Sequence, residues 1–245
     1  ITISGDLLSS QDLEKLDKNF DMIIHLAANA RVYDLVLEPH LALENFIMLF
    51  NILKFARKNN IKKFLFASSR EVYGNVSSLS FKETSASVDF CESPYAASKI
   101  GGEALVRSYA ACYHLQFIIV RFSNVYGKYD ESDRIIPLFI RLIQEGSQLT
   151  IFGKEKILDF TYIEDATSAL LSLIQQFDVV QGEVYNIAYG EGHSLIKVAE
   201  LLQESLQKKV DVYIKPSRTY EVTHYVADIK KIRDKVQFSS YIDLQ

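Results

Sequence analysis

The sequence predicts an α/β fold, a doubly wound parallel sheet with a smaller C-terminal lobe. Three short apolar runs indicate buried strands, and each is followed by small or polar residues. These runs cover residues 21–26, 64–67 and 117–120. Helical segments separate them, and strands that alternate with helices favour a parallel sheet. Because the carboxyl ends of parallel strands open into one crevice, Ala27, Ser68 and Arg121 are expected to converge there.

The composition indicates a globular, cytoplasmic protein. A chain of 245 residues with 48% hydrophobic content can bury a sizeable core. The net charge is -4 and no block of Lys or Arg occurs, so neither nucleic acid nor an anionic membrane is an expected partner. Cys91 and Cys112 are the only cysteines, which disfavours a disulfide framework and fits a reducing compartment. No apolar run reaches membrane-spanning length, and no histidine pattern has metal-ligand spacing.

The N-terminal part predicts a short amphipathic helix at residues 12–20, before the first strand. Residues 39–60 predict a long helix that is apolar on more than one face. Such a helix is covered on several sides, so we expect a further surface to pack against it. Polar Asn45 lies within this pattern, where a helix asparagine is commonly hydrogen-bonded inside the protein.

Two stretches carry the candidate chemistry, at residues 64–74 and 94–99. Ser69 would lie at the mouth of the second strand. A Ser-Pro pair fits an N-cap and first helical position before Tyr95, so Tyr95 and Lys99 would share one helix face. To act as a base near pH 7, the tyrosine pKa must fall by about three units, or ~4 kcal/mol. A neighbouring ammonium acts in that direction, and an oxidised nicotinamide ring would add to it.

The Tyr-x-x-x-Lys spacing alone is weak evidence, because 14 tyrosines produce about one such match by chance. An exposed tyrosine with a solvated lysine one turn later is the plain alternative. The context decides against it, since the motifs occur in a fixed order: His25-Leu26-Ala27-Ala28, Ser68-Ser69-x-x-Val72-Tyr73-Gly74, Tyr95-x-x-x-Lys99 and Arg121-Phe122-Ser123-Asn124-Val125-Tyr126-Gly127. In these motifs the chain resembles the extended short-chain dehydrogenase/reductase family, the nucleotide-sugar epimerases, dehydratases and decarboxylases.

By this resemblance, Ser69, Tyr95 and Lys99 correspond to the catalytic triad, and NAD is the expected cofactor. Ser69 would hydrogen-bond a substrate oxygen while Tyr95 moves its proton, and Lys99 would lower the phenol pKa and hold ribose. The residues that match cofactor-binding positions are Asp6, Leu7, Leu26, Ala27, Ala28, Asn45, Tyr95, Lys99, Phe122 and Val125. The residues that match substrate-binding positions are Ser69, Asn124, Phe152 and Arg218.

Several of these residues also have plain structural interpretations. Asp6 fits a turn residue after Gly5, and Asn45 fits a core asparagine. Arg218 fits either a surface arginine or a diphosphate ligand, for which a guanidinium fork is well suited. His25 lies within an apolar strand and is expected to be a buried core histidine.

Departures from the family pattern bear on the reaction. Many relatives carry arginine where Leu158 stands, so one expected phosphate contact is missing or comes from elsewhere. Glu71 matches a base used by dehydratases and also present in decarboxylases, which keeps both classes open. Arg70 stands where some dehydratases place an acidic proton donor, a role that a guanidinium does not fill. We therefore expect an NAD-dependent nucleotide-sugar 4-epimerase that acts through a transient 4-keto sugar. The alternatives are a 4,6-dehydratase or decarboxylase that uses Glu71, and a nonenzymatic dinucleotide-binding protein.

The predicted domains are interleaved. A dinucleotide-binding domain would comprise residues 1–128, with 158–190 returning to it, and a substrate-binding lobe would comprise 129–157 and 191–245. The glycine-rich phosphate loop that the resemblance calls for upstream is absent, and the chain opens on Ile1, so we expect a fragment with an N-terminally incomplete, Rossmann-like sheet.

The resemblance also implies partners. A nucleotide-sugar is the expected substrate, and the helices at 39–60 and 94–113 would pair with those of a second copy in the four-helix bundle of a homodimer. The preference for NAD over NADP rests on the resemblance alone.

Overall fold

The computed structural model describes residues 1–218 and 220–244, which form two compact units built from interleaved stretches of the chain. The first unit comprises Ile1–Gly74, Ala86–Arg121 and Gln176–Tyr185, and the second comprises Asn75–Ser85, Phe122–Gln175 and Asn186–Gln245. Of the predicted returning range 158–190, only 176–185 pack in the first unit. A packing unit and a functional domain need not coincide, so the functional division stays a prediction.

A four-stranded sheet of order β1-β2-β3-β7 forms the centre of the first unit. Its strands are β1 (Met22–His25), β2 (Lys63–Ser69), β3 (Gln116–Phe122) and β7 (Glu183–Ile187). The pairing of β1 with β2 is parallel and brings His25 opposite Phe66. Six of the seven residues of β2 are buried, which is typical of a strand covered on both faces. The predicted α/β class with a parallel sheet is confirmed.

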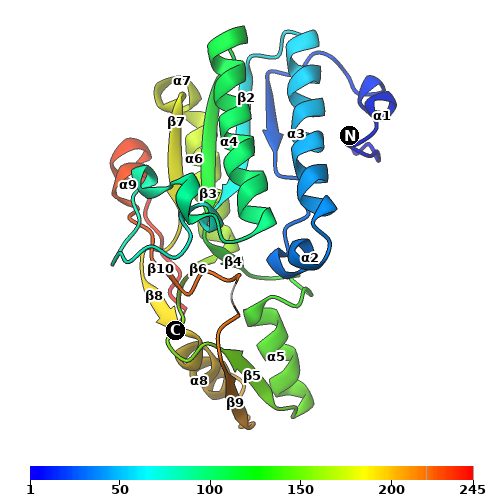
Figure 1. The fold of residues 1–245 in the computed structure, drawn as a ribbon. Helices are drawn as coiled ribbons and strands as arrows, with labels where there is room; N and C mark the ends of the chain where they lie inside the picture. Colours follow the sequence, from blue (N-terminus) through cyan, green and yellow to red (C-terminus); the bar gives the residue numbers. More distant parts are fainter. Residues whose placement is uncertain (219, 245) are drawn as a thin grey trace. The chain divides into compact units, whose positions relative to one another are not determined.

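The helices of the first unit flank this sheet. They are α1 (Ser10–Glu14), α2 (Val32–Leu37), α3 (His40–Lys58), α4 (Pro94–Tyr113) and α7 (Phe177–Val180), with the 3₁₀ turns η1 (Arg70–Tyr73) and η3 (Val88–Phe90). Helices α3 and α4 lie side by side, and α4 also packs against β2 (Figure 1). Helix α4 begins as predicted, because the Ser93 hydroxyl accepts a hydrogen bond from the Ala96 amide and Pro94 occupies the first turn.

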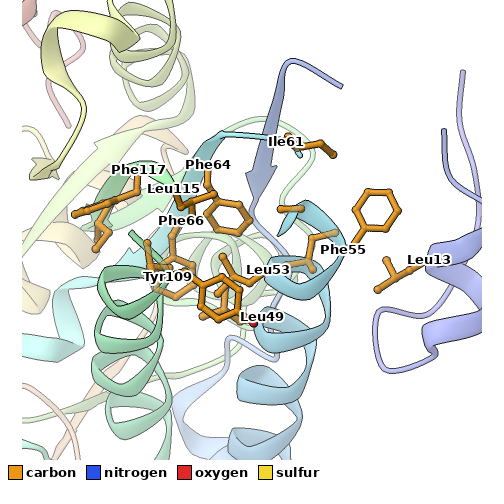
Figure 2. Close-up of a cluster of buried hydrophobic side chains, with 14 of the residues drawn as sticks. Leu13, Leu49, Leu53, Phe55, Ile61, Phe64, Phe66, Tyr109, Leu115 and Phe117 are labelled. Atoms are coloured by element: carbon orange, nitrogen blue, oxygen red, sulfur yellow. The ribbon is translucent and has the colours of Figure 1, made fainter. Parts of the chain in front are cut away.

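The core of the first unit lies between α3, α4 and the sheet. Figure 2 shows Phe66 of β2, Leu49 and Leu53 of α3 and Tyr109 of α4 gathered in one buried cluster. Gly102 of α4 lets the helix approach this cluster closely, since a Cβ there would lie 2.7 Å from the Phe66 ring. The strand and helix that carry the candidate chemistry are therefore held by a dense apolar contact.

The second unit contains two small sheets and four helices among its described residues. One sheet has the order β10-β6-β4 with β8 paired to β6, and the other joins β5 and β9. The strands are β4 (Asn124–Tyr126), β5 (Leu149–Phe152), β6 (Ile157–Tyr162), β8 (Gly192–Ser194), β9 (Val212–Lys215) and β10 (His224–Tyr225). The helices are α5 (Ile135–Glu145), α6 (Ile163–Gln175), α8 (Leu195–Ser205) and α9 (Lys230–Val236), with the 3₁₀ turn η2 (Glu83–Ser85).

Asp159 of β6 organises the second unit. Its carboxylate is fully buried and accepts hydrogen bonds from the main-chain amides of Tyr189, Gly190 and Ala227 at 2.9 to 3.2 Å. One side chain thus satisfies buried donors from two segments that are distant in sequence. The segments after β7 and after β10 are tied to β6 in this way.

The extra apolar face predicted for residues 39–60 is present on α3, where Leu43, Ile47 and Phe50 are exposed. The homodimer through α3 and α4 stays a prediction. In the part of the chain that the structure describes, the helices fall short of the length and hydropathy that a bilayer crossing requires.

Candidate active site

Ser69 lies where β2 ends and η1 begins. Its hydroxyl accepts a hydrogen bond from the Glu71 amide at 3.2 Å and so caps the 3₁₀ turn, and the residue is buried. Capping fixes the hydroxyl at the carboxyl end of a central strand, which is where ligands bind in open parallel sheets. The structure thus places Ser69 where the sequence predicts it.

Tyr95 and Lys99 lie in the first turns of α4, and both are buried. The Lys99 ammonium lies 5.7 Å from the centroid of the Tyr95 ring and donates a hydrogen bond to the Ala67 carbonyl at 2.8 Å. Ala67 is two residues before Ser69 on β2. Lys99 therefore joins the helix of the phenol to the strand of the serine, and the three candidate catalytic residues belong to one rigid part of the first unit.

The charge of Lys99 is finely balanced. Burial lowers the pKa of its ammonium to about 8, and the carboxylate of Glu103 acts in the opposite direction. The lysine thus remains a cation at neutral pH, as an ammonium that stabilises an ionised phenol must. Its Nζ also lies 5.2 Å from the centroid of the Phe66 ring, a favourable position for a buried cation.

Glu71 and Arg70 form an ion pair that the sequence reasoning missed. The Arg70 Nη2 and Glu71 Oε1 atoms are 2.8 Å apart, with the two side chains 13% and 6% exposed. Glu71 was predicted as a separate base, and Arg70 only as an unsuitable acid. A carboxylate and a guanidinium at this distance form a charge-assisted hydrogen bond.

Asn45 of α3 is hydrogen-bonded within the first unit. Its amide nitrogen donates to the Asn29 carbonyl at 3.0 Å and to the Ser98 hydroxyl at 3.3 Å, while its oxygen accepts from the Asn29 amide at 2.7 Å. Asn45 is thus buried and hydrogen-bonded, as its core interpretation requires, and its contact with the cofactor stays a prediction. The bonds hold the segment that follows Ala27 and Ala28, so Asn45 shapes the strand end even without touching a ligand.

The remaining candidates of the first unit lie near its N-terminal segment. The Asp6 carboxylate accepts from the Leu8 amide at 2.8 Å, which is the turn that the sequence also allowed. The Leu7 carbonyl accepts from the side chain of Asn51 at 2.9 Å. Leu26 and Ala27 are exposed after β1 and Ala28 is half-buried, so small or open positions follow this strand.

The candidates of the second unit cluster in two places. Asn124 begins β4 and donates to the Asp159 carbonyl at 2.8 Å, with Phe122 and Val125 half-buried beside it in the chain. Elsewhere, the Arg218 guanidinium lies 4.0 Å from the centroid of the Phe152 ring. An arginine and an aromatic ring in contact offer a charged and a flat surface together.

Leu158 is buried in β6, so that position contributes no cation to the second unit. Lys156, which the sequence reasoning missed, is buried nearby in the chain and pairs with Glu221 at 2.5 Å. Glu221 also lies 3.6 Å from Arg218. The missing phosphate contact at Leu158 stays a prediction. Among residues 1–218 and 220–244, no group of three or more His, Cys, Asp or Glu side chains could hold a metal ion.

His25 is a buried core histidine, as predicted. Its ring stacks on that of Phe66 with centroids 6.0 Å apart, and burial together with the Lys99 charge lowers its pKa to about 4. The unfolded chain, with an ordinary histidine pKa near 6.5, binds a proton more readily than the fold does. The contribution of neutral His25 to the free energy of unfolding is therefore fully present above about pH 6.5 and is lost as the pH falls toward 4.

We expect His25→Gln to remove this part of the acid sensitivity, about 3 kcal/mol between pH 6.5 and pH 4. The free energy of unfolding in urea, measured from pH 7 to pH 4.5, should decrease less steeply in the variant than in the parent. Exposed His40 provides the control, and His40→Gln should follow the parent. Parallel pH profiles for the parent and His25→Gln would contradict a buried neutral histidine.

A parallel sheet with a serine at one strand end, beside a helix that carries Tyr-x-x-x-Lys, defines the class of short-chain dehydrogenase/reductase proteins. The profile of the NAD dependent epimerase/dehydratase family matches residues 1–188, and the chain belongs to this family.

Individual relatives include both reaction types. The chain is 32% identical over 218 residues to the uncharacterized protein MJ1055 of Methanocaldococcus jannaschii, covering 88% of this chain and 66% of that protein. It is 34% identical over 196 residues to the dTDP-D-glucose 4,6-dehydratase of Dictyostelium discoideum, covering 75% of this chain and 45% of the relative. A solved UDP-N-acetylglucosamine 4-epimerase from Methanobrevibacter ruminantium superposes with a TM-score of 0.88 at 32% identity, over 98% of this chain and 77% of that one. The chain thus spans less than two thirds of the length of these two curated relatives.

Proposed function

We propose that the protein is an NAD-dependent nucleotide-sugar 4-epimerase. The placement of Ser69, Tyr95 and Lys99 supports oxidation of a sugar alcohol, a first step that epimerases, dehydratases and decarboxylases of this family share. The observation that favours epimerisation is the buried ion pair of Arg70 and Glu71. It engages the carboxylate that a dehydratase would use as a base, and it places a guanidinium where some dehydratases carry an acid.

In the proposed reaction Tyr95 removes the proton of the C4 hydroxyl, and Ser69 hydrogen-bonds the same oxygen as it becomes a carbonyl. NAD bound beside these residues would supply the hydride acceptor for C4 and the hydride donor for the other face of the 4-keto sugar. Lys99 stabilises the ionised phenol before it takes the proton and again after Tyr95 has given the proton back. Because each proton returns to the sugar, the residues finish in the state in which they began.

The first unit suits a dinucleotide at this strand edge. Ala27 and Ala28 leave the end of β1 open for close approach. The Lys99 ammonium has three donors, of which the Ala67 carbonyl takes one, so it can also hold ribose hydroxyls. We assign cofactor contacts to Asp6, Leu7, Leu26, Asn45, Phe122 and Val125, and substrate contacts to Asn124, Phe152 and Arg218, by the family pattern.

The principal alternative is a 4,6-dehydratase or decarboxylase in which Glu71 acts on the keto intermediate. The relatives that are dTDP-glucose 4,6-dehydratases favour this alternative at the level of sequence similarity. Against it, Arg70 forms an ion pair with Glu71, and a guanidinium does not release a proton at physiological pH. The product therefore distinguishes the two functions.

The test is to incubate the full-length protein with NAD and UDP-glucose, and in parallel with dTDP-glucose and UDP-glucuronic acid, and to follow the products by NMR. We expect the C4 epimer of one of these substrates, reached from either side of the equilibrium. A 4-keto-6-deoxy sugar or CO2 formed without epimer would contradict the proposal and assign the chemistry to Glu71. Protein with Tyr95→Phe, treated identically, controls for contaminating activities.

A further inference from the structure

Beneath the candidate active site lies a buried carboxylate that the reaction as described does not use. Glu103 of α4 is 10% exposed at its side chain and lies one helical turn after Lys99. Its Oε1 accepts hydrogen bonds from the Ser68 hydroxyl at 2.6 Å and from Arg121 Nε at 2.8 Å, and its Oε2 accepts from Arg121 Nη2 at 2.7 Å. The carboxylate is thus fully engaged by two neighbouring strands.

Arg121 extends the contact to a fourth element. Its Nη1 donates to the Tyr73 hydroxyl at 3.1 Å, and its guanidinium lies 5.0 Å from the centroid of the Tyr73 ring. Tyr73 ends the 3₁₀ turn that Ser69 caps. The bidentate Glu103–Arg121 pair therefore connects α4, the end of β2, β3 and η1, and three of these elements carry or border the triad.

A buried ion pair is by itself weak evidence for stability, because well-packed apolar residues often replace it at no cost. Its value here lies in what it connects. Ser68 is adjacent to Ser69 in β2, and Glu103 shares its helix face with Tyr95 and Lys99 at four-residue spacing. A shift of this carboxylate would move the serine relative to the phenol.

The charge of Glu103 also reaches Lys99, whose ammonium it favours against the effect of burial. Among the ionisable groups of the neighbouring elements, Glu103 is the one that favours the charged form of Lys99. His25 of β1 is buried and neutral, Tyr95 of α4 is the phenol itself, and in η1 Arg70 and Glu71 offset each other. Arg121 of β3 is a cation, and its positive charge is balanced by the carboxylate of Glu103.

From this geometry we propose that Glu103 is a positioning residue: with Arg121 it fixes the Ser68–Ser69 strand end against α4. The same carboxylate also favours the ammonium form of Lys99. The inference rests on the proposed function, because positioning matters only if the triad is catalytic. Removal of Glu103 alone would leave Arg121 as a buried cation without its carboxylate partner. Removal of both charges would restore the balance while losing the connection between the elements.

The experiment compares Glu103→Gln, the double variant Glu103→Gln/Arg121→Gln and Ser68→Ala in the full-length protein. Lys99 is titrated directly by NMR with ¹³C-labelled lysine, its signal being assigned through Lys99→Arg. Glu103→Gln is expected to shift the Lys99 midpoint to lower pH by about one unit or more, and the double variant is expected to recover most of that shift. Ser68→Ala is the matched control, which removes a hydrogen bond without changing charge and should leave the midpoint unchanged.

Kinetics provide the second measurement. In Glu103→Gln the high-pH limb of kcat/KM should move with the Lys99 midpoint, and in Ser68→Ala kcat should fall about tenfold with a smaller change in KM. A folded Glu103→Gln protein whose Lys99 midpoint and pH profile match the parent would overturn the proposal. If Glu103→Gln does not fold, the double variant provides the test. Its Lys99 midpoint should lie close to the parental value, and its kcat should fall. A double variant with the parental kcat would equally overturn the proposal. Because the titration needs no substrate, absence of epimerase activity would refute the proposed function without hiding this result.

Discussion

Tyr95→Phe is expected to lower kcat for 4-epimerisation by about 10³-fold, since positioned acid–base groups contribute roughly 10² to 10⁴ in rate. The substitution removes one oxygen from a buried ring beside Lys99 and leaves the packing of α4 in place. Initial rates measured by NMR, with circular dichroism to verify the fold and fluorescence to verify NAD binding, test this expectation. We expect nearly unchanged NAD binding, because we assign the ribose contact to Lys99.

Tyr113 at the other end of α4 offers the matched control. Its ring is 40% exposed and lies under Arg57, far along the helix from the triad, so Tyr113→Phe should leave kcat within a few-fold of the parent. Equal rates for Tyr95→Phe and its parent would remove the acid–base role of Tyr95. Binding of dinucleotide without turnover in the parent would instead favour the nonenzymatic alternative.

Gly74→Ala is expected to lower the free energy of unfolding by about 4 kcal/mol or more, a loss that few single substitutions reach. Gly74 closes η1 with φ 61° and ψ -155°, a region that is essentially restricted to glycine. A Cβ at this position would lie 1.8 Å from the Phe90 carbonyl oxygen, a contact that the backbone must move to relieve. Urea denaturation of parent and variant measures the loss.

Gly182→Ala separates the two causes. Gly182 has φ 83°, yet a Cβ there would have no atom within 4 Å, so only backbone strain of about 1 to 3 kcal/mol is expected. Gly74→Ala should therefore cost clearly more than Gly182→Ala. Equal losses would show that the Phe90 segment yields without cost.

The elements that the sequence predicted well are those whose signals are local. The buried strand ending at Ser69 follows from a short apolar run, and α4 follows from the Ser-Pro cap before Tyr95. The first helix was less well predicted: residues 12–20 were expected, but α1 covers Ser10–Glu14, because Ser9 caps it earlier and the periodic pattern continues beyond its end. Short elements such as β8 and β10 depend on pairing with β6 and have little signal of their own.

The candidate site divides in the same way. The positions of Ser69, Tyr95 and Lys99 could be predicted because their spacing and order are visible in the sequence. The Glu103–Arg121 pair could not, since nothing in sequence connects residue 121 to a position on α4 before β3 is placed beside β2. A hint was present in Glu103 itself, which continues the four-residue spacing from Tyr95 through Lys99. The ion pair of neighbouring Arg70 and Glu71 was overlooked because the two residues were weighed singly.

The strand order has a consequence for folding during synthesis on the ribosome. Strand β7 completes the sheet beside β3, although residues 123–182 are synthesised between the two strands. The Gly182 amide, just before β7, donates a hydrogen bond to the Phe117 carbonyl of β3. Until β7 emerges, the nascent chain presents β3 as an open edge, which is a template for pairing with other chains. Throughout that interval the growing polypeptide is therefore exposed to pairing with other chains along β3.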